Sequence, residues 1–175
     1  MNTGDLAWVL ISAALVWLMT PGLALFYGGL GEKRNLLHTM FVPVLIIGIA
    51  TLVWFFAGYS LAFGGSGDVI GNLNHILMFD VSFNRSSRGL TIPDGAFSLF
   101  QGMFPIITAA IITGSVIGRV RIKAMIVFMI LWLIVIYSPL AHMVWGGAFL
   151  AKLGAIDFAG GTVVHISSGV TGLRS

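Results

Sequence analysis

The sequence predicts an all-α integral membrane protein, and three observations support this prediction. The 175-residue chain is 58% hydrophobic and only 9% charged, and its mean hydropathy of +1.01 lies outside the usual range of soluble domains. Its apolar residues form five runs, most of them near or above the roughly 20 residues that a membrane-spanning helix needs. The basic residues lie in the connectors between these runs, where lysine and arginine set membrane orientation.

The first run is expected to form a helix over about residues 6–26. It has no basic n-region, so it is interpreted as a retained helix and not as a signal peptide. Thr20-Pro21-Gly22 is expected to interrupt its second half, and Gly28-Gly29 to end it.

The other four helices are expected at about 36–63, 96–117, 124–149 and 157–173, so that residues 1–175 form a single transmembrane domain. The second, third and fourth carry Pro43, Pro105 and Pro139. The fifth has reached only Leu173 when the sequence stops, so this helix is expected to be cut short.

Basic residues counted on alternate sides of the membrane predict the orientation. Three fall on one side, and six fall on the other, namely Lys33, Arg34, Arg119, Arg121, Lys123 and Arg174. The positive-inside rule then places the N-terminus outside the cell membrane and the C-terminus in the cytoplasm. The long glycine-rich connector, residues 64–91, is expected to be extracellular.

Composition also excludes several function classes. The net charge is +3 and the pI is 9.7, but no basic patch is interleaved with stacking aromatics, so a nucleic-acid partner is not expected. The absence of cysteine excludes disulfides and thiolate sites. No nucleophile–base pair, paired carboxylates or phosphate-binding glycine loop lies at membrane depth, so neither an enzyme nor a cofactor or metal is predicted.

The fifth run carries two ionisable residues in the stretch Asp157-Phe-Ala-Gly-Gly-Thr-Val-Val-His165. Such residues are costly at membrane depth and mark a pathway or binding site by default. Asp157, Gly161, His165 and Gly169 recur every four residues, which predicts one helical stripe with glycines on either side of the imidazole. Asp157 is also a favoured residue for capping the start of a helix.

Aromatic residues in the third and fourth runs indicate a cation-attracting mouth. Phe97, Phe100 and Phe104 share one helical face, and Trp145 lies near the predicted outer end of the fourth run. Ring faces attract cations, whereas an interior histidine offers one donor and one acceptor without a fixed charge. This layout suits a solute that arrives as a cation and loses its proton, and ammonium is the smallest common one.

Simpler interpretations remain open for the same residues. Spacing alone favours packing roles for Phe100 and Phe104, and Trp145 fits an interfacial belt. For His142, both a packing role and a functional role remain open.

Four motifs occur in an order that resembles a known family. They are Met19-Thr-Pro-Gly-Leu-Ala-Leu-Phe-Tyr-Gly-Gly29, Phe100-Gln-Gly-Met-Phe104, Ala141-His-Met-Val-Trp-Gly-Gly147 and the stretch from Asp157 to His165. Together they resemble the N-terminal half of the ammonium transporter (Amt/Mep/Rh) family. The resemblance implies the five-transmembrane-helix half of an inverted-repeat ammonium transporter fold.

The resemblance also implies roles for six residues. Trp145, Phe100 and Phe104 match the outer recruiting site and the phenylalanine gate, and Asp157 matches a buried aspartate that supports ammonium recruitment. Ala159 matches a residue whose carbonyl faces the solute, and His165 matches the first of two pore histidines.

The chain departs from the family pattern in two respects. The second inverted repeat, with the partner histidine, the second gate phenylalanine and an outer-site hydroxyl, has no counterpart here. The connector from Gly118 to Lys123 also lacks a glutamate that relatives place before its first arginine.

Three interpretations therefore stay open. The chain is an ammonium/ammonia-conducting unit, a half-transporter or assembly module that needs a complementary half, or an inactive truncated product. The partners implied are ammonium or ammonia, the lipid bilayer, and a complementary half or a homo-oligomer, since relatives form trimers.

Overall fold

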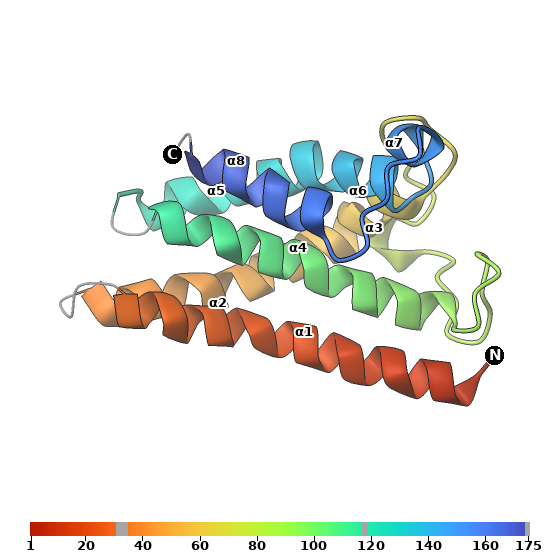
Figure 1. Cartoon of the computed structure of the whole chain (residues 1–175), viewed down its shortest axis with the longest axis horizontal. Coiled ribbons are helices and arrows are strands. Elements are labelled where there is room, and N and C mark those ends of the chain that lie inside the picture. The colour runs from red at the N-terminus through yellow and green to blue at the C-terminus, as the bar shows by residue number, and fades with distance from the viewer. Residues whose placement is uncertain (31–34, 117–118, 174–175) are drawn as a thin grey trace.

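The computed structural model describes residues 1–30, 35–116 and 119–173, and all regular structure within these ranges is helical. The helices run roughly along one common axis, and the last helical segment lies against α4 (Figure 1). Four helical stretches are long and apolar enough to cross a membrane: Thr3–Leu30, Leu36–Phe63, Asp94–Val116 and Ile122–Lys152. The predicted all-α membrane fold is confirmed.

The first and third stretches are single helices, and the others are built from shorter pieces. The single helices are α1 (Thr3–Leu30) and α4 (Asp94–Val116). The second stretch comprises α2 (Leu36–Val53), the π-helical turn η2 (Trp54–Gly58) and α3 (Tyr59–Phe63). The fourth comprises α5 (Ile122–Trp132), the π-helical turn η4 (Leu133–Tyr137), α6 (Ser138–Val144) and, after a turn, α7 (Phe149–Lys152). The last segment comprises the π-helical turn η5 (Gly161–Ile166) and α8 (Ser167–Leu173).

The expected interruption of the first helix is wrong. α1 continues through Pro21 and through Gly28-Gly29 and ends at Leu30. Proline is tolerated inside a membrane-spanning helix because neighbouring helices and local adjustments satisfy the freed backbone groups. Gly28 has a packing role instead: a Cβ there would lie 2.6 Å from Cγ of Met40 on α2, so a larger residue would require the Met40 side chain to move.

The fifth helix also begins later than expected. Its first helical residue is Gly161 and not Asp157, and Gly160 precedes it with a left-handed φ of +79°. Residues 157–160 therefore approach the helix without belonging to it. The fourth predicted helix, 124–149, is likewise broken, because α6 ends at Val144 before the short α7. Ile117, the expected end of the third helix, lies outside the described residues.

α4 is the central helix of the bundle. It packs against α1, α2 and α8, and more of it is buried than of any other spanning stretch. The buried core continues from it to α2 and to the fourth stretch through Ile46, Ala50, Ile106, Ala109, Met129 and Tyr137. Within this core the indole Nε1 of Trp54 donates to the carbonyl of Ser98 at 3.1 Å and joins the second stretch to α4.

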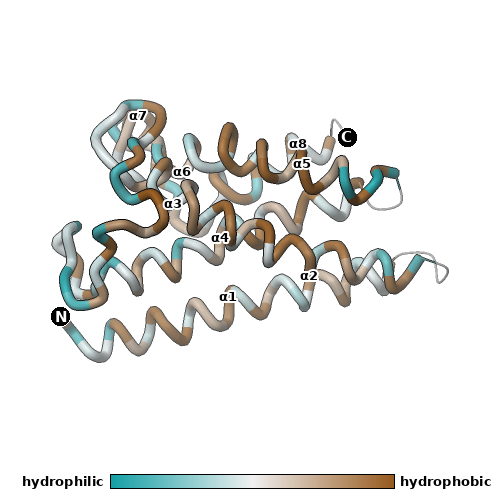
Figure 2. The backbone as a smooth tube through the Cα atoms, turned by 180° about the vertical axis from the view of Figure 1, so that it is seen from behind, coloured by the Kyte–Doolittle hydropathy of each residue, from teal (hydrophilic) through white to brown (hydrophobic). Residues whose placement is uncertain are grey.

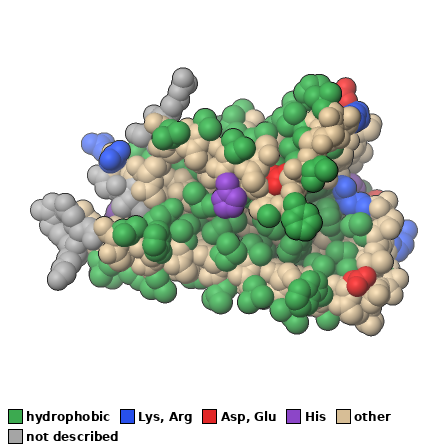
Figure 3. Space-filling view, viewed as in Figure 1, with side chains coloured by type: hydrophobic (Ala, Val, Ile, Leu, Met, Phe, Trp, Pro, Cys, Tyr) green, Lys and Arg blue, Asp and Glu red, His purple; other side chains and the backbone are tan. Residues whose placement is uncertain are grey.

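Polar residues gather at the two ends of the bundle, and the helices between them are apolar (Figure 2). Lysine and arginine side chains likewise lie toward both ends in the space-filling view (Figure 3). The loop end is the end that carries the N-terminus, residues 64–93 and α7; the basic end carries residues 35–38 and 119–123. Lys33, Arg34 and Arg174, which entered the orientation count, lie outside the described residues.

Candidate functional site

Phe100, Phe104 and Trp145 form one cluster, called here the aromatic cluster. The ring centroids of Phe100 and Phe104 on α4 are 5.1 Å apart at an interplanar angle of 87°. Those of Phe104 and Trp145 are 5.4 Å apart at 62°. Both contacts are edge-to-face, the arrangement that aromatic quadrupoles favour. All three side chains remain partly exposed, so the cluster retains accessible ring surface.

Trp145 joins this cluster to the fifth segment. It lies at the C-terminal end of α6, and its indole Nε1 donates to the backbone carbonyl of Asp157 at 3.2 Å. The indole is thus fixed by a ring contact with Phe104 and by this hydrogen bond, so its position depends on how the fifth segment begins.

Asp157 caps the start of η5 with both carboxylate oxygens. Oδ1 accepts from the backbone N–H of Gly161 at 2.7 Å, and Oδ2 accepts from Thr162 at 2.8 Å and Val163 at 2.9 Å. The first N–H groups of a helix have no partner inside the helix, and an anion there is further stabilised by the helix dipole. Asp157 therefore caps the start of the helical turn, as expected for this residue type. It precedes the helical residues, however, so it does not lie on the helical stripe that the spacing of four predicted.

His165 and Ala159 line a cavity between α1, α4 and η5, called here the His165 cavity. Its volume is about 390 Å³. Its other lining residues are apolar side chains and one glycine: Val16, Met19, Gly22, Leu23, Phe26, Phe104, Ile107, Ile111 and Val164. Phe104 belongs both to the aromatic cluster and to this cavity, so the two sites adjoin. The contribution of α1 was not anticipated from the sequence.

The ring of His165 is the free polar group of this site. His165 is exposed, and among the described residues no hydrogen bond to its imidazole is recorded. Its backbone is fixed, because its N–H donates to Gly160 O at 3.0 Å and its carbonyl accepts from Ser168 Oγ at 3.3 Å. The π-helical turn therefore presents the two ring nitrogens of an imidazole at the cavity wall.

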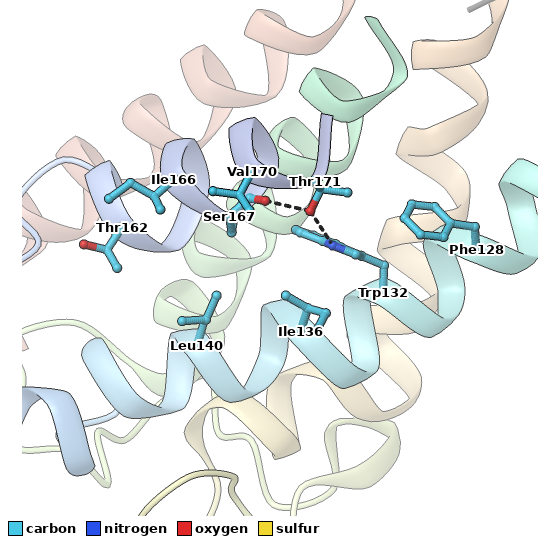
Figure 4. Close-up of a pocket in the computed structure, with 9 residues that line it drawn as sticks. All are labelled: Phe128, Trp132, Ile136, Leu140, Thr162, Ile166, Ser167, Val170 and Thr171. Carbon is cyan, nitrogen blue, oxygen red and sulfur yellow. Dashed lines mark hydrogen bonds between the residues drawn. The ribbon is translucent and has the colours of Figure 1, made fainter. Parts of the chain in front are cut away.

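A larger groove of about 650 Å³ lies on the other side of η5 and α8, facing α5 and α6 (Figure 4). The indole Nε1 of Trp132 donates to Thr171 Oγ1 at 3.0 Å across it, and Thr171 Oγ1 donates to the Ser167 carbonyl at 2.7 Å. Its nine lining residues include no ionisable group and none of the six predicted site residues. The smaller His165 cavity is therefore the candidate functional site.

His142, left open by the sequence, is a buried structural link. Its ring nitrogens lie 2.9 Å from the Ala62 carbonyl and 2.7 Å from the Gly67 carbonyl. It therefore connects α6 to the end of α3 and to the loop that follows, three residues before Trp145. Sequence spacing could not reveal these carbonyls, because they lie 80 and 75 residues away in the chain.

An exposed ion pair joins the long loop to α7 at the loop end. Lys152 Nζ lies 2.7 Å from Asp68 Oδ1. The hydrogen bond from Lys152 and its positive charge hold the pKa of Asp68 below the ordinary value of 3.8. Because the backbone N–H of Phe149 also donates to the Asp68 carbonyl at 3.0 Å, the loop is attached to α7 at two points.

Comparison with known proteins decides the family. The model of the Ammonium Transporter Family matches residues 7–175. The chain belongs to this family. An ammonium transporter from Bacillus subtilis is 46% identical over 173 residues, which cover 99% of this chain and 43% of the relative. One from Aquifex aeolicus is 45% identical over 178 residues, covering 99% of this chain and 41% of the relative.

Solved structures of the family show the same fold. The crystal structure of Candida albicans Mep2 matches with a TM-score of 0.89 at 37% identity, covering 99% of this chain and 38% of that one. The chain thus spans less than half the length of these members of the ammonium transporter family. The relatives are transporters, and the prediction that the chain is not an enzyme is confirmed at the level of the family.

Proposed function

We propose that the chain forms one wall of an ammonium pathway, in which a cation is recruited at the aromatic cluster and ammonia passes His165. The main support for this proposal is the position of Phe104, which contacts Phe100 and Trp145 and also lines the His165 cavity. A cation held against these rings would lie directly beside the cavity. The family of the chain supports ammonium as that cation.

The two steps follow from the polarity of the two sites. Ring faces attract a desolvated cation by about 2 kcal/mol or more. A lone charge in a medium as apolar as the His165 cavity would cost tens of kcal/mol, roughly, by Born solvation. Ammonium is therefore proposed to give its proton to bulk water at the partly exposed aromatic cluster, and neutral ammonia to enter the cavity. There the imidazole of His165 offers it a donor and an acceptor, and Ala159 is proposed to offer its carbonyl.

Asp157 is proposed to act through position. Its carboxylate is occupied by three backbone N–H groups, and its carbonyl accepts the hydrogen bond of Trp145. It thus fixes both the start of η5, on which His165 lies, and the indole of the aromatic cluster. Its negative charge at the helix start also favours an approaching cation.

The proposed pathway needs a cover over His165. Ile156 and Phe158, which precede η5 in the sequence, are 89% and 99% exposed, and His165 is also exposed. A polar side chain facing hydrocarbon is costly, and such residues almost always face a bundle interior or a water-filled cavity. We propose that a complementary half-transporter covers this face. A second or third copy of this chain, as in a trimer, is the competing cover.

The proposed location is the cell membrane, with the loop end outside. Arg119, Arg121 and Lys123 lie together at the basic end, and the sequence adds Lys33, Arg34 and Arg174 to that side. Only Arg85, Arg88 and Lys152 belong to the loop end. The positive-inside rule favours a cytoplasmic basic end, which places the aromatic cluster toward the outside.

Uptake of methylammonium in cells that lack ammonium transporters tests the proposal. The chain would be expressed alone and together with the remaining half of the Bacillus subtilis relative. We expect uptake only with the second half present, lost in His165→Ala and retained in the matched control His38→Ala at the basic end. Uptake that His165→Ala leaves unchanged would refute the role of His165. Robust His165-dependent uptake by this chain alone would refute the need for a distinct half.

The same assay tests recruitment at the aromatic cluster. Trp145→Leu should weaken uptake mainly at low external methylammonium, because it removes a ring from the mouth and leaves the His165 cavity in place. Trp8→Leu, which changes an exposed tryptophan at the loop end of α1, is the control. An unchanged concentration curve for Trp145→Leu would reduce Trp145 to an interfacial anchor.

A further inference from the structure

Arg88 from the long loop places its guanidinium against two aromatic rings that also contact each other. Its central carbon lies 5.0 Å from the ring centroid of Phe63 and 5.0 Å from that of Phe97. The two rings contact each other edge-to-face, with centroids 5.1 Å apart at 79°. Arg88 Nη2 also donates a hydrogen bond to the Phe63 carbonyl. Ring faces and a carbonyl are the groups that a planar cation needs.

Asp94 holds the backbone next to Arg88 in place. The backbone N–H of Ser87 donates to both carboxylate oxygens of Asp94, at 3.0 Å and 2.9 Å. Asp94 is buried and only 4% exposed. The N–H of Asp94 in turn donates to the Arg85 carbonyl at 3.0 Å. The loop is thereby closed on the first turn of α4, and Arg88 extends from it to the end of α3.

We propose that Phe63, Phe97 and the Phe63 carbonyl form a cation-binding site for a guanidinium-type ion, and that Arg88 of the same chain occupies it. The buried carboxylate of Asp94, one residue removed through Ser87, adds negative charge beside the site. A guanidinium suits this cage better than an ammonium does, because it is planar, stacks on ring faces and is weakly hydrated. Its occupation fastens residues 64–91 to α3 and α4.

The occupied cage also affects the neighbouring aromatic cluster, and this consequence rests on the proposed function. Phe97 lies one turn before Phe100 on α4. An empty cage there would compete with the aromatic cluster for an arriving cation. With Arg88 in place, the ring of Phe97 is engaged, whereas Phe100, Phe104 and Trp145 keep accessible ring surface without a cation. Arg88 would thus be a positioning residue that keeps the cation on the pathway.

Chemical rescue of the thermal stability tests the site without any transport readout. In Arg88→Ala the cage is empty and the loop loses one of its attachments to the helices, so Tm in detergent should fall. Millimolar guanidinium chloride should raise the Tm of this variant more than sodium chloride of the same concentration. The matched control Arg85→Ala removes a nearby exposed arginine and should show no specific response to guanidinium. A Tm for Arg88→Ala equal to that of the control, or equal rescue by sodium, would overturn the proposal.

A measurement on the unaltered chain covers the case in which Arg88→Ala does not fold. Protons of a side chain that faces two rings are shifted upfield in the NMR spectrum by ring currents. The Arg88 δ and ε protons should show this shift, and Phe97→Leu should reduce it. Ordinary arginine shifts for Arg88 in the unaltered chain would contradict the proposed occupancy. Because both tests report stability or contact, they can fail while ammonium uptake succeeds, and the reverse.

Discussion

Asp157 and His165 lie eight residues apart in one apolar segment, yet the hydrogen bonding of their side chains differs. Both oxygens of Asp157 are taken by backbone N–H groups at 2.7 to 2.9 Å. The imidazole of His165 borders a cavity, and no hydrogen bond to it is recorded among the described residues. A polar residue in an apolar segment can therefore hold the fold together or remain free for a solute. Its hydrogen bonds, and not its depth, distinguish the two.

A large effect on stability is expected at Asp157. Asp157→Ala leaves three N–H groups without their acceptor and should cost about 2 kcal/mol. Thermal unfolding in detergent would measure the loss.

Asp157→Asn sharpens this test, because an amide oxygen can replace only one of the two carboxylate oxygens. We expect a loss between that of alanine and zero. If alanine and asparagine both left Tm unchanged, the cap would not stabilise the chain. If asparagine kept Tm and abolished uptake, the charge itself would serve the pathway.

An effect of comparable size is expected at His142. His142→Ala leaves the carbonyl of buried Ala62 and that of Gly67 in the exposed loop without their ring partner and opens a cavity, which should cost about 1–3 kcal/mol. Loosening should concentrate on the loop after α3, because Gly67 O is one of the two acceptors. Hydrogen exchange of residues 64–72 would detect it. Exchange that stays unchanged there would show that His142 does not hold the loop.

Much of this architecture could be predicted from the sequence because bilayer spans have a simple physical signature. The second span is helical over the predicted range, Leu36–Phe63. Helical spacing also predicted that Phe100 and Phe104 share a face, and the four motifs pointed to Trp145 as their neighbour. Such features depend on local periodicity and on order along the chain.

Features that depend on distant backbone atoms could not be predicted. The spacing of four from Asp157 to Gly169 assumed a regular helix, whereas the structure has a left-handed Gly160 and a π-helical turn there. Pro21 was expected to break α1, but neighbouring packing overrides that local preference. Arg88 and Phe63 are 25 residues apart, and their contact depends on how the loop folds back.

A small, pH-dependent effect is expected at the exposed pair of Asp68 and Lys152. Since Lys152 holds the pKa of Asp68 below 3.8, the folded state favours the carboxylate. The pair therefore stabilises the chain fully above the ordinary pKa and loses this contribution as pH falls through the lower, folded value. The gain is modest because exposed pairs are screened.

The sign of this effect is tested by comparing the Tm of the unaltered chain with that of Asp68→Asn at neutral and acidic pH. The difference in Tm should be present near neutral pH and disappear in acid. A difference that grew on acidification would contradict the assignment.

The smallest effect on stability is expected at His165, and it completes the comparison with Asp157 and His142. His165→Ala removes an exposed ring with no recorded hydrogen bond, while the backbone bonds to Gly160 and Ser168 remain. Tm should therefore stay close to that of the unaltered chain, although uptake in the covered assembly should be lost. His142→Ala, measured in parallel, shows what a structural histidine costs. If His165→Ala destabilised the chain as much as His142→Ala does, its ring would have a structural partner and would not be free to meet ammonia. Unchanged Tm together with lost uptake would identify the free imidazole as the group that serves the pathway.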